Sequence, residues 1–84
     1  MWHVYVLKSL KNQRLYTGST NDLQRRLAEH QRGKNRYTRY AGPFELVYSE
    51  THADRLEARR REWYLKSGKG RHFIQELLKE RVGH

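Results

Sequence analysis

Five residues of this chain have side chains that together could carry out the hydrolysis of a phosphodiester. They are two phenols, a guanidinium, an imidazole and a carboxylate: Tyr5, Tyr16, Arg26, His30 and Glu62. A phenol can relay a proton through water, or act as a base where nearby positive charge favours its phenolate form. A guanidinium suits phosphate oxygens, and a carboxylate can hold Mg²⁺ together with water and substrate phosphates.

Each of the two tyrosines also has a purely structural explanation. The chain contains six tyrosines, and tyrosine is a common packing residue in strands. Tyr16 is followed two residues later by Gly18, and a glycine at a strand end permits a bulge or a close backbone approach to a ligand. The glycine favours a functional role for Tyr16, while packing alone stays open for both tyrosines.

Arg26 and His30 are one helical turn apart, so they are expected to share a face beside the apolar pair Leu23 and Leu27. An arginine at the margin of an apolar stripe is half-buried, and it either extends toward water or holds an anion. His30 could assist proton transfer to a leaving group, or it could complement the dipole at the C-terminal end of its helix. The sequence leaves these alternatives open.

Glu62 follows three arginines and shares one helix flank with Ala58 and Leu65, which lie at i−4 and i+3. A carboxylate beside apolar residues is unusual for a purely solvated glutamate, and it could hold Mg²⁺ or Mn²⁺. The alternative is a salt bridge with the neighbouring arginines. Glu57 falls on a different side of the helix and is expected to face solvent.

The charge of the chain favours a polyanionic partner. Eighteen Lys and Arg against nine Asp and Glu give a net charge of +9, spread along the whole sequence. Such a balance points to nucleic acid, with DNA preferred, rather than to an anionic membrane. The residues expected to contact nucleic acid outside the chemical site are Arg25, Lys34, Arg36, Tyr37 and Arg39.

Several classes of protein are disfavoured. The chain has no cysteine, which excludes a disulfide framework and a thiolate zinc site, and the five histidines lack ligand spacing. The segment 68–70 lacks the spacing of a phosphate-binding loop. Neither a long apolar run nor a signal-peptide pattern is present. We expect one domain over residues 1–84, soluble and cytoplasmic.

The hydrophobic pattern predicts an α+β fold in the order β-β-α-β-α-α. Residues 2–9 alternate with both faces partly apolar, which indicates a strand covered on both sides. In the third strand, Phe44, Leu46 and Tyr48 are expected on one side and Val47 on the other. A hairpin and a third strand predict a small, mostly antiparallel sheet flanked by helices. The expected strands are 2–9, 15–18 and 44–49, and the expected helices run from a cap at Thr20 or Asn21 to Gly33, from a cap at Thr51 to about 67, and over 72–81 after a break at Gly68 and Gly70.

These segments resemble the GIY-YIG nuclease domain. The triplets 3–5 and 16–18, the helix segment 22–30 and the glutamate segment 59–68 follow the order of its motifs, and the resemblance covers nearly all of the chain. The chain is similar to the short, single-domain bacterial members of the UPF0213 type. His3 stands where the first triplet has glycine, and Thr17 where the second has isoleucine; both are backbone and packing positions.

The resemblance implies a function and a role for each residue. It implies a divalent-metal-dependent endonuclease in which Tyr5 and Tyr16 flank the attacking water and one of them is the general base. Arg26 would bind the scissile phosphate, His30 would assist, and Glu62 would be the single protein ligand of Mg²⁺ or Mn²⁺.

Two other functions remain open. The same basic fold could bind nucleic acid without cutting it, with a basic aromatic segment around Tyr37 supplying phosphate contacts and base stacking. Nucleases of this family usually take their target choice from an attached domain, so a nuclease subunit that depends on a targeting protein is the other alternative.

Overall fold

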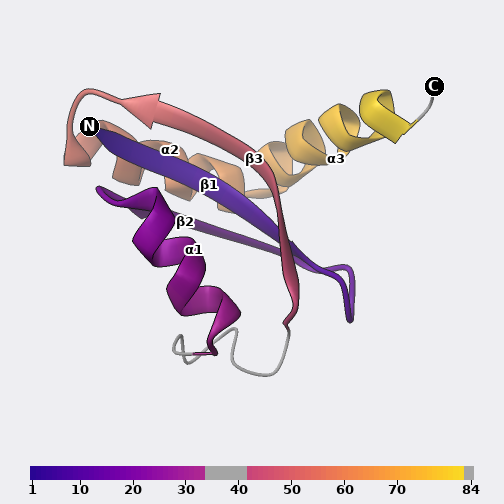
Figure 1. Ribbon diagram of the computed structural model, residues 1–84. Coiled ribbons are helices and arrows are strands. Elements are labelled where there is room, and N and C mark those ends of the chain that lie inside the picture. The colour runs from indigo at the N-terminus through magenta and orange to yellow at the C-terminus, as the bar shows by residue number, and fades with distance from the viewer. Residues whose placement is uncertain (34–41, 83–84) are drawn as a thin grey trace.

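The protein forms a three-stranded antiparallel sheet with three helices, as a computed structural model that describes residues 1–33 and 42–82 (Figure 1). The elements follow one another as β1 (Trp2–Ser9), β2 (Leu15–Thr20), α1 (Leu23–Gln31), β3 (Phe44–His52), α2 (Arg55–Lys66) and α3 (Gly68–Val82). The sheet has the order β2-β1-β3. The predicted α+β class and the element order are confirmed. No helix within the described ranges is long and apolar enough to span a bilayer.

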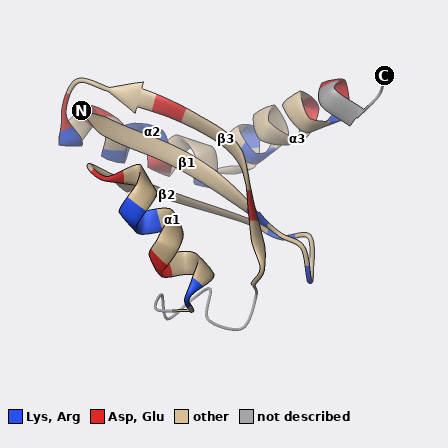
Figure 2. Ribbon diagram, viewed as in Figure 1, with Lys and Arg blue, Asp and Glu red and all other residues tan. Residues whose placement is uncertain are grey.

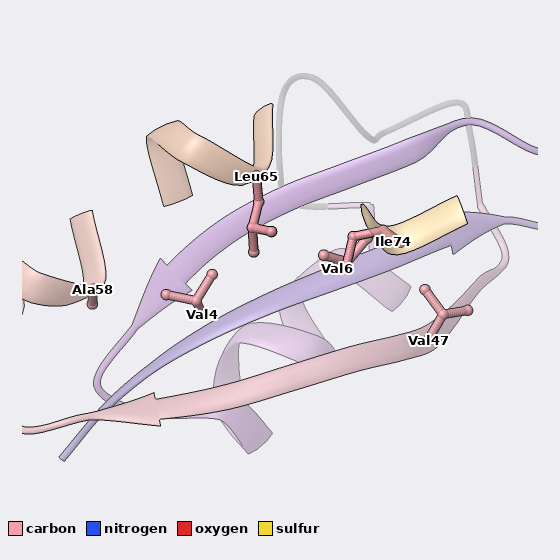
Figure 3. Packing of buried hydrophobic residues seen from close by; sticks show 6 residues of the cluster. All are labelled: Val4, Val6, Val47, Ala58, Leu65 and Ile74. Carbon is pink, nitrogen blue, oxygen red and sulfur yellow. The ribbon is translucent and has the colours of Figure 1, made fainter. Parts of the chain in front are cut away.

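The central strand β1 is covered on both faces, as its double alternation predicts. Val4 and Val6 point toward α2 and α3 and pack with Val47, Ala58, Leu65 and Ile74 (Figure 3). Tyr5 and Leu7 point to the other face and pack with Phe44 and with Leu23 and Leu27 of α1. Since strand side chains alternate between faces, one strand contributes to two separate apolar clusters on opposite sides of the sheet.

The third strand contains a bulge that overturns one part of the predicted pattern. Val6 pairs with Tyr48 and Leu7 pairs with Leu46, so Val47 is an extra residue on β3. A bulge interrupts the strict alternation of side chains. Tyr48 therefore packs on the α2 side together with Val47, whereas Phe44 packs on the α1 side. The prediction that Phe44, Leu46 and Tyr48 share one side was wrong for Tyr48.

Several element boundaries differ from the predicted ones because strand pairing continues further than propensity indicates. Pairing of His3 with Thr20 extends β2, and pairing of Trp2 with His52 extends β3. Thr20 and Thr51 are therefore strand residues rather than helix caps. The caps are Asp22 and Asp54, whose carboxylates accept hydrogen bonds from the backbone N–H groups of the third residue beyond each. Aspartate satisfies an otherwise unpaired helical N–H group as well as threonine does.

Helices α2 and α3 are separated by a single residue, and only one of the two predicted glycine breaks occurs there. Helix α2 ends at Lys66 with Ser67 as its C-cap, and α3 already begins at Gly68. Gly70 lies inside α3, where a Cβ atom would be 2.1 Å from the carbonyl oxygen of Tyr64 and 2.4 Å from the Cα of Leu65. The absence of a side chain allows α3 to approach the end of α2, so Gly70 serves close packing rather than helix termination.

Candidate active site

The five residues predicted to carry chemistry line one cleft. The cleft has a volume of about 500 Å³ and lies along the edge strand β2, between α1 and α2. Its lining includes Tyr5, Tyr16, Arg26, His30 and Glu62. They come from four elements, so the assembly of this group depends on the packing of α1 and α2 on opposite faces of the sheet.

The hydroxyl group of Tyr5 connects three of these residues. The Nε–H of Arg26 donates to the Tyr5 oxygen over 3.3 Å, and the Tyr5 oxygen lies 3.1 Å from Nε2 of His30. Because the arginine can only donate, the Tyr5 oxygen accepts that bond and its own proton is available for His30. Tyr5 and His30 are only 2% and 6% exposed, so this hydrogen-bonded pair is shielded from bulk water.

The surroundings keep both members of the pair neutral. Burial raises the pKa of Tyr5 above its ordinary value, and the hydrogen bond and charge of Arg26 only partly oppose this. Burial also lowers the pKa of His30, and the positive charge of Arg26 lowers it further. A neutral imidazole can accept the Tyr5 proton at Nε2. Although His30 lies in the last turn of α1, a lowered pKa disfavours the alternative in which it complements the helix dipole as a cation.

Gly18 provides the space that the Tyr5 side chain occupies. The two residues are paired across β1 and β2, and a Cβ atom at Gly18 would lie 2.5 Å from the Tyr5 hydroxyl oxygen. The sequence suggested a bulge or a close approach to a ligand at this glycine, whereas the group that approaches it is the Tyr5 ring. Tyr16, two residues earlier on the same strand face, packs edge-on against Phe44 with ring centroids 5.5 Å apart.

Glu62 lies on the opposite side of β2 from Tyr5, and its side chain is 15% exposed. The Ser19 hydroxyl donates to Oε1 over 2.6 Å, and Nζ of Lys66 donates to Oε2 over 2.7 Å. The predicted flank is confirmed, since Ala58 and Leu65 are buried. An ion pair does occur, but its partner is Lys66 rather than a neighbouring arginine. Glu57, with a side chain 56% exposed, faces solvent as expected.

The donor set around Glu62 suits only some metal ions. Within residues 1–33 and 42–82 no group of three or more His, Cys, Asp or Glu side chains could hold a metal. A zinc site needs such a group, whereas Mg²⁺ commonly uses one or two carboxylates and completes its shell with water and substrate phosphate oxygens. A single partly buried carboxylate beside a hydroxyl therefore fits Mg²⁺ or Mn²⁺.

Four further residues of the cleft were not singled out from the sequence. They are three cations and the serine that contacts Glu62: Arg59, Lys66, Arg71 and Ser19. Lys66 at i+4 and Arg59 at i−3 from Glu62 could have been found from helical spacing. Ser19 is 43 residues from Glu62 in sequence, and no local pattern predicts that contact.

The residues predicted to contact nucleic acid outside the cleft have different outcomes. Arg25 has a side chain 67% exposed and forms an i, i+4 ion pair with Glu29. It also lines a more open hollow of about 710 Å³ that shares Arg26 and Arg59 with the cleft. Lys34, Arg36, Tyr37 and Arg39 lie outside the described residues. Figure 2 shows basic positions on α1, on α2 and at the start of α3, the elements that border the cleft.

The chain is similar to several known proteins. A UPF0213 protein of Clostridium perfringens is 46% identical over 67 residues, which cover 79% of this chain and 71% of that protein. A UPF0213 protein of Xanthomonas campestris is 46% identical over 66 residues, and the matched region spans only 64% of its length. The solution NMR structure of the UPF0213 protein BH0048 from Bacillus halodurans, 37% identical, matches with a TM-score of 0.55 over 92% of this chain and 85% of that chain.

The family assignment rests on a match over most of the sequence. The profile of the GIY-YIG catalytic domain matches residues 1–75, a range that includes all five cleft residues. The chain therefore belongs to the GIY-YIG catalytic domain family, whose members are nuclease domains.

Proposed function

We propose that this protein is a divalent-metal-dependent endonuclease that hydrolyses DNA phosphodiester bonds in the cleft along β2. The observation that carries the proposal is the arrangement around the Tyr5 hydroxyl. This hydroxyl contacts Arg26, which can bind phosphate, and His30, which is a neutral proton acceptor. The same cleft also contains Glu62. A module that only binds nucleic acid has no need for a buried phenol–imidazole pair or for a carboxylate among cations.

The cleft has the charge that a phosphodiester requires. Arg26, Arg59, Lys66 and Arg71 line it together with the single carboxylate of Glu62. Guanidinium groups bind phosphate oxygens through charge-assisted hydrogen bonds and stabilise the charge that develops on them. Arg26 lines the cleft, has a side chain 36% exposed and donates to Tyr5, and it is the residue we assign to the scissile phosphate.

The protons of the reaction move through Tyr5 and His30 in this proposal. A phenol whose pKa is raised stays protonated at neutral pH, so its phenolate form is not available as the base. It can still accept a proton from the attacking water while passing its own proton to Nε2 of His30, which is neutral and 3.1 Å away. Tyr5 is therefore the proton-accepting tyrosine, and Tyr16 helps to orient the water.

Glu62 is the residue we assign to the metal ion, with Ser19 fixing one carboxylate oxygen. A divalent ion held there would supply positive charge against the phosphate oxygens of the transition state. A role for a protein partner in choosing the target belongs to the same proposal.

A cleavage assay tests the proposal directly. Wild type and Glu62→Gln are incubated with labelled duplex, single-stranded, flapped and four-way DNA and with RNA, in Mg²⁺, Mn²⁺ or EDTA. We expect metal-dependent cutting by wild type and a loss of about 10² in rate or more in the variant. Binding of every substrate without cutting would contradict the endonuclease and support the alternative of a binding module or a partner-dependent subunit.

A pair of variants separates a metal ligand from a simple ion-pair partner. Lys66→Met removes the partner of Glu62 but keeps the carboxylate, whereas Glu62→Gln keeps the lysine and removes the charge. If Glu62 binds metal, Mn²⁺ affinity measured by electron paramagnetic resonance is lost in Glu62→Gln and retained or increased in Lys66→Met. If Glu62 serves only the ion pair, neither variant changes the affinity for Mn²⁺.

A further inference from the structure

Helix α2 exposes a large aromatic side chain that its packing does not use. Trp63 is 81% exposed and, among the large apolar residues that the structure describes, only Met1 is more exposed. The neighbouring positions on that side of the helix, Arg59 at i−4 and Arg60 at i−3, are also exposed. We call Arg59, Arg60 and Trp63 the outer face of α2. A single exposed apolar residue is common on a protein surface, but an exposed indole beside two guanidinium groups offers a ligand both a stacking surface and positive charge.

The outer face of α2 is continuous with the cleft. Arg59 belongs to both, since it lines the cleft, and Lys66 lines the cleft one turn away from Trp63 at i+3. Glu62 precedes Trp63 in sequence and points into the cleft, while Trp63 points to solvent. A strand with one phosphate in the cleft therefore reaches Trp63 by crossing the side chains of Arg59 and Lys66.

The second tryptophan differs from Trp63. Trp2 packs against the buried cluster on the α2 side of the sheet, and the Arg55 guanidinium lies over its ring at 5.7 Å from the centroid. Its position is explained by the fold. Among the described residues, the indole of Trp63 is the large aromatic surface that lies beside the cleft and faces solvent.

We propose that Trp63 is a stacking platform for an unpaired base of the nucleic-acid strand whose phosphate lies in the cleft. The inference rests on the proposed function and deepens it, because it specifies that the substrate has single-stranded character beside the scissile bond. The bases of a duplex are covered by their neighbours above and below, whereas an unpaired base has a free face for an indole. Arg59 and Arg60 supply the positive charge that follows the phosphate backbone on both sides of that base.

The test compares binding of a thymidine oligonucleotide and of a duplex of the same length, in EDTA, by fluorescence anisotropy. Trp63→Ala should bind the single strand about five-fold or more weakly and the duplex within about two-fold of wild type. Trp63→Phe, which retains a stacking ring, should recover most of the lost affinity. Leu10→Ala is the control, because Leu10 is also an exposed apolar residue, at 50%, but lies in the β1–β2 hairpin and does not line the cleft.

A spectroscopic readout accompanies the affinities. The chain has two tryptophans, so Trp2→Phe leaves Trp63 as the only source of indole emission. The single strand should quench this emission, and the duplex should not.

The outcomes divide clearly. Unchanged affinity of Trp63→Ala for the single strand, an equal loss for both nucleic acids, or no quenching of Trp63 each overturns the stacking platform. These results leave the proposed nuclease intact if wild type still cuts. Failure of wild type to cut any substrate, with Trp63-dependent binding preserved, would overturn the nuclease and keep the platform.

Discussion

The Tyr5 hydroxyl brings together the side chains on which the proposed chemistry depends. Arg26 donates to its oxygen and His30 lies within hydrogen-bond distance behind it, while Gly18 leaves room for the ring. The arginine that would bind phosphate also helps to hold the histidine neutral, because its charge lowers the pKa of His30. Arg26 therefore links phosphate binding to proton acceptance, because it contacts Tyr5 and lowers the pKa of His30.

The pH dependence of cleavage follows from this coupling. The proton path needs neutral His30, and the pKa of His30 is lowered from its ordinary 6.5. We expect kcat/KM of wild type to stay level through neutral pH and to fall only as the pH drops through that lowered pKa. Tyr5→Phe should lose about 10²–10⁴ in rate, and His30→Gln should be slower and should lack the acidic limb attributable to His30.

Two measurements check this prediction: cleavage by a variant of a tyrosine outside the cleft, and the pH dependence of the free energy of unfolding. Tyr64→Phe should cut like wild type, because Tyr64 does not line the cleft. The pKa of His30 is lower in the folded protein than in the unfolded chain, so the unfolded chain binds a proton more readily. The free energy of unfolding should therefore fall as the pH drops below the ordinary pKa of histidine. Wild type should therefore lose more unfolding free energy than His30→Gln between pH 7.5 and 5.5. An unchanged acidic limb in His30→Gln would refute the proton path.

At the scale of elements, the cleft depends on how α2 is held. Arg61 of α2 donates from Nε to both carboxylate oxygens of Glu50 on β3, at 3.1 and 3.0 Å. The same guanidinium lies over the rings of Tyr64 and Phe73. These contacts attach α2 to β3 and α3 at once. They explain why Arg61 is partly buried while Arg59 and Arg60 remain available on the outer face of α2.

The close contact between α2 and α3 leads to a prediction on stability. Gly70→Ala would place a methyl group against the backbone of Tyr64 and Leu65, which cannot move as a flexible side chain can. We expect a loss of about 3 kcal/mol in the free energy of unfolding, measured by denaturant titration. Gly68→Ala is the matched control, because no atom lies within 4 Å of a Cβ at Gly68; it should change stability by about 0.5 kcal/mol or less.

Gly70→Ala should also affect nucleic-acid binding, because α3 contributes residues to the cleft. Arg71 and Ile74 follow Gly70 on α3 and line the cleft. In protein that remains folded, Gly70→Ala should therefore weaken nucleic-acid binding, whereas Gly68→Ala should not. Equal stability of the two variants would show that α3 does not depend on this close approach.

At the scale of the whole molecule, the net charge of +9 is distributed so that cations surround the cleft. Arg26, Arg59, Lys66 and Arg71 line it, and Figure 2 shows further basic positions on the same helices. A surface of this kind attracts nucleic acid largely through release of counterions from the phosphates. The affinity should therefore depend steeply on salt concentration.

The salt dependence gives a test that is independent of catalysis. The slope of log K against log salt concentration should decrease in magnitude by about 1 for Arg71→Ala, because one phosphate contact is lost. Lys79→Ala is the control: Lys79 is also exposed on α3, at 77% for its side chain, but it does not line the cleft. A slope that changes equally for both variants would mean that only the overall charge matters.

The sequence alone determined the fold class, the central strand and the identity of the five cleft residues. Two apolar faces on residues 2–9 predicted a covered strand, and the i, i+4 spacing of Arg26 and His30 placed them on one helix face. The covered strand and the shared helix face depend on neighbours within one or two turns of the chain, so local periodicity is sufficient to find them. The five cleft residues as a set came from the resemblance to the GIY-YIG motifs, because periodicity alone left a structural explanation open for each. The order of motifs then indicated the family.

Only the tertiary structure decided which of these residues touch and which faces are buried. The hydrogen bonds Tyr5–His30 and Ser19–Glu62 join residues 25 and 43 positions apart, and the bulge in β3 reversed the expected side of Tyr48. In α2, Ala58 and Leu65 are buried whereas Trp63 is exposed. Such outcomes depend on strand register and helix packing between distant segments, which local pattern does not specify.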